Sequence, residues 1–217
     1  MEFDDTIRGL LATRREAGDQ IPDDPTTRLM NEQVADRPLT ETEIVSILRN
    51  WTVGELGTMA SSVGIIAYYL ATHPSLQQDL RDKPSLIGAA NDEILRIHAP
   101  LLANRRRATR SVSLGGETLK AGDRVSILWA SANRDETVFG DPDEFRLDRD
   151  PELNLLYGAG IHACPGAPLA RMELSDIIEA LLTQTLRIAS IPTKAPRHNA
   201  YPASGYSEVF VQLSHSQ

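Results

Sequence analysis

The chain has 217 residues, of which 41% are hydrophobic, and carries a formal net charge of −8 at pH 7. This length supports a sizeable core in one large or two small domains, and the negative charge argues against a nucleic-acid partner. A single cysteine cannot form an internal disulfide and no apolar run is long enough to cross a bilayer, so we expect a cytoplasmic protein without a membrane anchor.

The first third of the chain predicts two segments. Residues 1–38 are polar with short apolar pieces, which indicates an amphipathic helix followed by a loop. Thr40 and Glu43 form the pattern of a capping box, so a helix should begin at Glu41. Apolar residues then continue on most sides of a predicted helix over 41–73, far longer than the average of about 11 to 12 residues. A helix of this kind is expected to run through a core.

Two glycines interrupt this long helix. Gly54 and Gly57 weaken the hydrogen-bond ladder within one turn, next to the small polar side chain of Thr58. One interpretation is that a ligand approaches the backbone there. The other is that the glycines let a neighbouring helix pack closely, and the sequence alone leaves both open.

Two further helices are predicted before the chain changes character. Residues 75–78 have the pattern of a second capping box, which would open a short surface helix that Pro84 ends. Another helix is expected over 85–98. Within it, Glu93 and Arg96 are three residues apart and share one face, so they can pair. From spacing alone, such a pair is usually a solvated surface interaction.

The second half predicts short strands and one more helix. A Gly-Gly turn within 112–119 indicates a hairpin, and an apolar run over 125–129 indicates a strand. Residues 132–149 are rich in turn formers and lack periodicity. A buried amphipathic helix is expected over 169–182, followed by two weak strands around a turn at 202–205.

The single cysteine lies in a glycine-rich loop just before the last predicted helix. There, the helix dipole and free N–H groups favour an anionic Cys164 sulfur. Glycines at 158, 160 and 166 let the backbone bend tightly and press against a flat ligand, and His162 could donate to an anion. Metal ligation is favoured over a nucleophile because no triad partners are evident. A buried inert cysteine is the remaining alternative.

The residues from Tyr157 to Gly166, Tyr-Gly-Ala-Gly-Ile-His-Ala-Cys-Pro-Gly, resemble the haem-binding loop of the cytochrome P450 family. The resemblance implies haem b as cofactor, with Cys164 as proximal iron ligand and His162 at a propionate. It places Tyr157, Gly158 and Gly166 among the residues at the cofactor. Tyr157 stands where the family usually has phenylalanine, which keeps an aromatic ring and could add a hydrogen bond. The implied fold is mainly α with small β-sheets.

Other motifs extend the resemblance. Glu93-Ile-Leu-Arg96 resembles the E-x-x-R motif, which in that family is a buried network completed by an arginine matching Arg149. The resemblance therefore implies that the Glu93–Arg96 pair is buried, and not a solvated interaction at the surface. Arg106 matches an arginine that pairs with a haem propionate, with its neighbours Arg105 and Arg107 as register alternatives.

The glycines of the long helix also match a family motif. Gly54-Glu55-Leu-Gly57-Thr58 resembles the oxygen-activation motif, with Glu55 in place of the usual glycine and Gly57 in place of the usual acid. The resemblance implies that Thr58 and Glu55 are the catalytic residues that deliver protons, and that Gly54 lies at the cofactor. It also implies a substrate pocket lined by Val53, Leu101, Leu102, Ala103 and Tyr206.

The resemblance covers 1–217 as a single partial domain, from the central helix to the haem-binding loop and following helix at 155–183. It therefore implies the C-terminal half of a soluble bacterial-type monooxygenase that hydroxylates a small organic substrate with dioxygen. Implied partners are a ferredoxin or flavodoxin-type protein, and the missing N-terminal half or another chain. The alternative is a truncated or degenerate P450-like protein that binds haem, or is structural, without normal activity. A helical interaction module with an incidental cysteine is a third interpretation.

Overall fold

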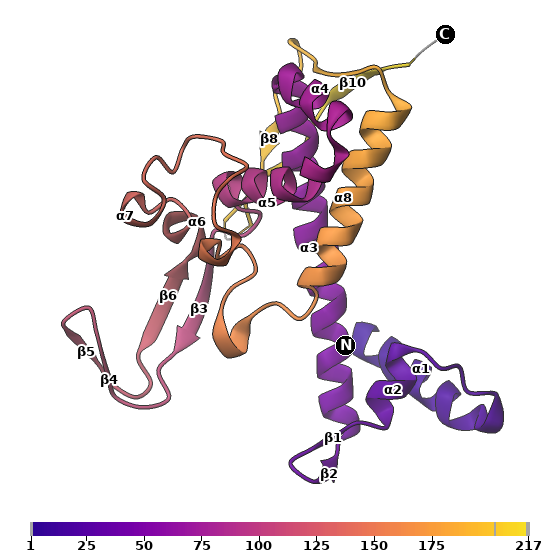
Figure 1. The fold of residues 1–217 in the computed structure, drawn as a ribbon. Coiled ribbons are helices and arrows are strands. Elements are labelled where there is room, and N and C mark those ends of the chain that lie inside the picture. The colour runs from indigo at the N-terminus through magenta and orange to yellow at the C-terminus, as the bar shows by residue number, and fades with distance from the viewer. Residues whose placement is uncertain (1, 202, 216–217) are drawn as a thin grey trace. The chain divides into compact units, whose positions relative to one another are not determined.

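The computed structural model describes residues 2–201 and 203–215, which form helices and small two-stranded antiparallel sheets (Figure 1). The chain divides into two compact units, residues 1–57 and 58–217. No helix in the described part of the chain combines the length and apolar character that a bilayer span requires.

The first unit contains more structure than the sequence predicts. Helix α1 spans Glu2–Glu16, a 3-10 turn covers Gly18–Gln20, and α2 spans Pro25–Met30. Strands β1 (Gln33–Val34) and β2 (Arg37–Pro38) form a hairpin. The prediction of a plain loop after α1 is therefore wrong. Asp24 caps α2 by accepting a hydrogen bond from the Thr27 amide at 2.9 Å, and the adjacent proline favours the first helical position.

Helix α3 spans Glu41–Thr72, where the sequence predicts 41–73. The predicted capping box is confirmed: the Thr40 amide donates to Glu43 Oε2 at 2.8 Å, and the Glu43 amide donates to Thr40 Oγ1 at 3.3 Å. Leu39 packs against a small cluster of the first unit, made of the buried residues Ile7, Leu11, Ile44 and Val45.

The expectation that all of α3 runs through a core is wrong for its middle. Trp51, Val53 and Leu56 are 45%, 65% and 69% exposed. Further along the helix, Ile66 and Leu70 are fully buried. The apolar side chains of the middle turns therefore lie outside the two buried clusters of the described residues, whereas those of the later turns belong to one of them.

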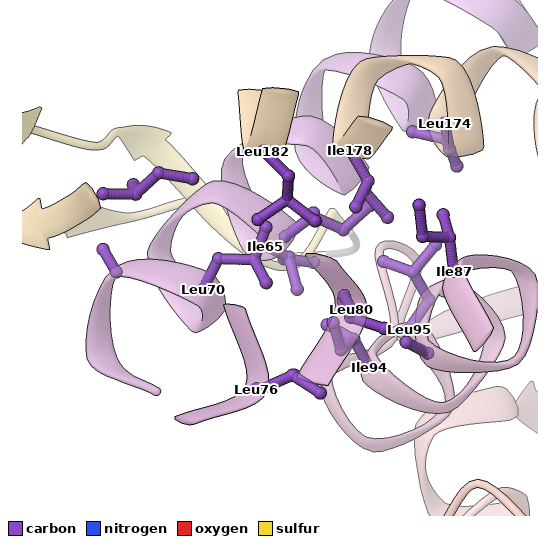
Figure 2. Close-up of a cluster of buried hydrophobic side chains, with 14 residues drawn as sticks. Ile65, Leu70, Leu76, Leu80, Ile87, Ile94, Leu95, Leu174, Ile178 and Leu182 are labelled. Carbon is purple, nitrogen blue, oxygen red and sulfur yellow. The ribbon is translucent and has the colours of Figure 1, made fainter. Parts of the chain in front are cut away.

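The core of the second unit lies where four helices meet. Helices α4 (Pro74–Asp82), α5 (Ile87–His98, preceded by a 3-10 turn at Pro84–Leu86) and α8 (Ala167–Gln184) surround the end of α3. Figure 2 shows their apolar side chains directed toward one another, among them Ile65, Leu70, Leu76, Leu80, Ile87, Ile94, Leu95, Leu174, Ile178 and Leu182. Burial of this apolar surface stabilises the arrangement and fixes where α5 and α8 lie.

The second predicted capping box, at residues 75–78, is wrong. Helix α4 begins at Pro74, and its N-cap His73 makes no side-chain cap hydrogen bond. Gln78, which should close the box, donates to Asp82 Oδ1 at 2.8 Å. Its neighbour Gln77 is buried: the Gln77 amide nitrogen donates to Leu70 O at 2.7 Å and to Ile188 O at 2.8 Å, and its oxygen accepts from the Ile188 amide at 3.0 Å. The helix is thus joined to the C-terminal sheet rather than lying free on the surface.

Four antiparallel strand pairs complete the second unit. Strand β3 (Ala103–Arg107) pairs with β6 (Arg124–Leu128), and β4 (Val112–Leu114) pairs with β5 (Glu117–Leu119). Near the C-terminus, β7 (Arg187–Ser190) pairs with β10 (Val211–Ser214), and β8 (Arg197–His198) pairs with β9 (Tyr206–Glu208). The predicted Gly-Gly hairpin is confirmed by positive φ angles at Gly115 and Gly116.

The segment between β6 and the cysteine loop is irregular, as predicted, apart from short helices. These are α6 (Trp129–Ala132), α7 (Glu136–Phe139) and 3-10 turns at Pro151–Leu153 and Gly160–His162. Because these pieces are too short to be stable alone, side-chain contacts must hold the segment in place.

Candidate functional site

The cysteine loop is tightly curled and holds its thiol at the surface. Cys164 is exposed, and its amide donates to Tyr157 O at 2.7 Å. Gly158 has a φ of +73°, and a Cβ there would lie 3.1 Å from His162 O. Only glycine fits this position without strain, so it sets the curl that closes the loop between Tyr157 and Cys164.

The loop leads directly into α8. The Ala167 amide donates to Cys164 O at 3.2 Å, and a Cβ on Gly166 would lie 3.8 Å from Cys164 Sγ. The thiol therefore lies near the unsatisfied N–H groups at the start of a long helix. His162 is exposed on the 3-10 turn just before the cysteine. Exposure of the thiol overturns the alternative of a buried inert cysteine.

Tyr157 forms the packed underside of the loop. The guanidinium carbon of Arg171 lies 4.6 Å from the centre of its ring, and Arg171 in turn pairs with Asp92 at 2.9 Å. The Tyr157 hydroxyl is buried, and no described residue serves as its hydrogen-bond partner, so the hydrogen bond expected from this tyrosine is not made. Burial raises the pKa of Tyr157 to about 12.

The structure brings Glu93, Arg96 and Arg149 together in a buried network. Arg96 Nε donates to Glu93 Oε2 at 2.7 Å, and Arg149 Nε donates to Glu93 Oε1 at 2.9 Å. The Arg96 side chain is 1% exposed. Burial alone would raise the pKa of Glu93, but hydrogen bonds from Arg96, the Arg146 amide and Arg149 together lower it. The interpretation of this pair as a solvated surface interaction is therefore wrong.

This network organises the irregular segment. Arg96 Nη1 donates to Asn133 O at 2.6 Å, and Arg149 Nη1 donates to Phe139 O at 2.8 Å, while both guanidinium groups lie against the Phe139 ring. Asn133 Oδ1 then accepts from the Leu155 amide at 2.8 Å, at the start of the cysteine loop. Sequence reasoning missed Asn133, because its turn-rich surroundings give no signal that its side chain is buried.

Arg106 lies on β3, half-buried and separated by strand geometry from its basic neighbours. Its Nη1 donates to Arg105 O at 2.9 Å. Because alternate residues of a strand face opposite sides, Arg105 and Arg107 point away from the face that carries Arg106. The three arginines therefore cannot serve one ligand as register alternatives.

The motif residues of α3 keep helical spacing. Glu55 and Thr58 are both half-buried and lie three residues apart, so they share one side of the helix. A Cβ added to Gly54 or Gly57 would meet no described atom within 4 Å. The described residues therefore show no close packing at these two glycines, and ligand approach and helix packing both stay predictions.

The residues predicted to line a substrate pocket have varied surroundings. Val53 is 65% exposed, Leu101 forms a β-bridge with Ala203, and Ala103 is 3% exposed. Leu102 is half-buried, and its carbonyl accepts from the Ala130 amide at 3.4 Å. Tyr206 packs its ring edge-on against Tyr68, 5.1 Å between centres. Two cavities among the described residues, one beside Tyr69 and Phe145 and one beside Leu181 and Leu213, are lined by none of these five.

The site fits a metal held by one protein ligand. No group of three or more His, Cys, Asp or Glu side chains among the described residues could hold a metal ion by itself. A haem supplies its own four nitrogen ligands and takes a single thiolate from the protein in haem-thiolate enzymes, which matches one exposed thiol on a glycine-rich loop. Fold and loop together describe a mainly helical protein that offers a single exposed thiolate donor at the start of a long helix.

Comparison with known proteins gives the family. Residues 1–200 match the family model described as Cytochrome P450, and the chain belongs to the cytochrome P450 family. Cyclomarin C epoxidase CymV of Salinispora arenicola is 37% identical over 166 residues, and nocardicin C N-oxygenase of Nocardia uniformis is 37% identical over 188 residues. These alignments cover 76% and 84% of this chain but 42% and 46% of the relatives.

Solved structures agree with the fold. Substrate-free CYP109E1 from Bacillus megaterium superimposes with a TM-score of 0.90 at 26% identity, over 99% of this chain and 55% of that one. CYP101C1 gives a TM-score of 0.88 at 33% identity, over 99% and 54%. The chain therefore spans about half the length of the relatives it matches, and the predicted partial P450 fold, mainly α with small β-sheets, is confirmed.

Proposed function

We propose that the chain is the haem-binding part of a monooxygenase, which uses dioxygen and electrons from a ferredoxin or flavodoxin-type partner to oxidise a small organic molecule. The observation that carries this proposal is the exposed Cys164 thiol on a loop curled by Gly158 and followed by a long helix. Family membership supports haem b as the cofactor. The single cysteine supports work in a reducing cytoplasm.

Each predicted site residue has a role in this proposal. Cys164 would bind the iron, while Arg106 and His162 would bind the propionates. The haem, when bound, supplies the oxygen and electron-transfer chemistry. Thr58 and Glu55 hold and relay protons from one side of α3, a role that their helical spacing and half-buried positions support.

The proposal for the substrate rests on the names of similar proteins, because those names describe the reactions of these proteins. The two relatives named above are an epoxidase and an N-oxygenase, both of which add oxygen to an organic molecule. We propose a small organic substrate here, with the five predicted pocket residues near its binding site. A polypeptide that completes the fold, in the same protein or as another chain, is part of this proposal.

A second candidate is a haem-binding P450-like protein without normal monooxygenase activity. Gly57 in place of the usual acid favours it, because a proton relay with one acid fewer is less efficient.

The test is haem titration followed by a reduced carbon-monoxide difference spectrum. The protein should take up haem and show the band of a thiolate-ligated iron, Cys164→Ser should lose it, and the adjacent exposed change Ala163→Ser should keep it. Absence of haem uptake by the folded protein would contradict both candidates. Substrate oxidation with a supplied redox partner would favour the monooxygenase, and a thiolate band without turnover would favour the second candidate.

A further inference from the structure

Two asparagine side chains hold consecutive backbone amides at the start of the cysteine loop. Asn133 Oδ1 accepts from the Leu155 amide at 2.8 Å, and Asn154 Oδ1 accepts from the Leu156 amide at 2.9 Å. Because only the oxygen of an asparagine amide can accept a hydrogen bond, these bonds fix the orientation of both side chains. Asn133 and Asn154 are named here the asparagine clamp.

The asparagine clamp is tied to helix α5. The Asn133 carbonyl accepts from Arg96 Nη1 at 2.6 Å, and Asn154 Nδ2 donates to Asp92 O at 3.2 Å. Helix α5 belongs to the core of the second unit. Asn133 is 1% exposed, so the described residues themselves enclose it, whatever polypeptide completes the fold. The clamp therefore joins the start of the loop to a fixed part of the core.

Backbone hydrogen bonds continue from the clamp to the thiol. The Gly158 amide donates to Leu155 O at 3.0 Å, which closes a turn over residues 155–158. Tyr157, inside this turn, accepts from the Cys164 amide at 2.7 Å. The backbone of the cysteine is thus held by a turn whose first residue is held by Asn133. Groups that orient the protein ligand of a metal affect both metal affinity and activity.

We propose that Asn133 and Asn154 are positioning residues, which set the place of the Cys164 thiol relative to α5. The proposal rests on the function proposed above, in which this thiol binds the haem iron.

The two asparagines use their amide groups differently. Asn154 uses both ends, whereas Asn133 Nδ2 is buried and no described residue accepts a hydrogen bond from it. A buried donor without an acceptor costs stability. The oxygen is therefore the part of the Asn133 side chain that the loop uses, and the nitrogen is the part that can be replaced.

The same substitution at both positions tests this difference. Asn133→Asp keeps the acceptor for Leu155, and its charge lies beside a network of two guanidinium groups and one carboxylate. Asn154→Asp keeps the acceptor for Leu156 but loses the donor to Asp92 O and places a carboxylate against that carbonyl. Asn133→Leu has a similar volume and removes the acceptor.

Hydrogen exchange of the Cys164 amide, measured by NMR on the full chain without haem, reports whether the loop is held. Asn133→Leu and Asn154→Asp should each speed this exchange by about tenfold, because each loses a hydrogen bond that opposes local opening. Asn133→Asp should keep the wild-type rate. The control is Gln77→Leu, which strips hydrogen bonds between α4 and the C-terminal sheet and should leave the loop rate unchanged.

The reduced carbon-monoxide spectrum of the haem-loaded variants is the second measurement. Asn133→Leu and Asn154→Asp should weaken the thiolate band, while Asn133→Asp and Gln77→Leu should keep it. Should Asn133→Leu not fold, Asn154→Asp at a half-buried position gives the same comparison.

The proposal is overturned if the Cys164 exchange rate is the same in Asn154→Asp and in wild type, or if Asn133→Asp exchanges as fast as Asn154→Asp. It is also overturned if Gln77→Leu speeds the exchange as much, since general destabilisation would then explain the effect. A wild-type protein without a thiolate band would instead contradict the proposed function, and the exchange rates, measured without haem, would still decide whether the clamp holds the loop.

Discussion

Replacing Glu93 with glutamine tests whether the buried network holds the second unit together. The substitution keeps the shape of the side chain and removes its charge, while Arg96 stays 1% exposed and loses its counter-ion. Breaking a buried ion pair by removing one partner costs about 3–5 kcal/mol. Domains of this kind have about 5–15 kcal/mol of total stability, so Glu93→Gln should lower the free energy of unfolding by a large fraction.

Two further variants calibrate this effect. Arg149→Met leaves the bonds from Arg96 and the Arg146 amide to Glu93, but it removes the donor to Glu93 Oε1 and the bonds of Arg149 to the carbonyls of Phe139, Asp141 and Glu144, so a loss of about 3 kcal/mol is expected. Asp148→Asn makes the same acid-to-amide change in an exposed ion pair, where the Asp148 side chain is 72% exposed, and should change stability little.

The assay is urea unfolding at pH 7 and at pH 4 and below. The network lowers the pKa of Glu93 in the folded state, so its stabilisation is fully present above the unfolded pKa of about 4.3. It is lost as the pH falls through the folded pKa. The difference between wild type and Glu93→Gln should therefore narrow in acid. A difference below about 1 kcal/mol at pH 7, or one that does not change with pH, would refute the reasoning.

Three other substitutions probe packing, each by urea unfolding. Tyr157→Phe removes a buried hydroxyl that has no partner among the described residues and should raise the free energy of unfolding by about 1 kcal/mol; a loss would reveal a bond to that hydroxyl. Gly205→Ala places a Cβ 2.8 Å from Ile65 Cγ1 at a φ of +72° and should cost about 1–3 kcal/mol, so an unchanged stability would contradict the close approach. Gln77→Leu strips three hydrogen bonds from Leu70 and Ile188 and should cost about 3 kcal/mol, whereas a neutral result would show that these backbone groups find other partners.

The two capping-box patterns show which structure the sequence can predict. Thr40 and Glu43 satisfy each other within one turn, so the start of α3 follows from four residues. The pattern at residues 75–78 fails because the helix already begins at Pro74, and Gln78, which should close the box, donates to Asp82 Oδ1 at 2.8 Å. The pattern also gives no sign that its neighbour Gln77 bonds to Ile188, far away in the chain. Local competition is visible in a sequence, whereas a buried backbone group that must be satisfied from another element is not.

The candidate site also combines local features, which the sequence indicates, with long-range contacts, which it does not. The curl of the cysteine loop is local and rests on Gly158, so the sequence indicates it directly. Spacing places Glu93 and Arg96 on one face of α5 but says nothing about what covers that face. Phe139 and Arg149, which belong to an irregular segment far along the chain, cover the Glu93–Arg96 pair. Only the family resemblance predicted that this pair is buried.

The run Arg105-Arg106-Arg107 is the clearest example of a long-range contact that the sequence does not show. In the sequence it is one basic run, and its members look interchangeable as ligands for a single anion. Once β3 pairs with β6, alternation sends Arg106 to the half-buried face and its neighbours to the face of Arg124. That pairing joins segments separated by a hairpin and is a tertiary property, so no local pattern could assign the faces. One run therefore lies on two surfaces: Arg106 on the half-buried face of β3, and Arg105 and Arg107 on the exposed face, where Arg107 Nε donates to Gly122 O at 2.9 Å.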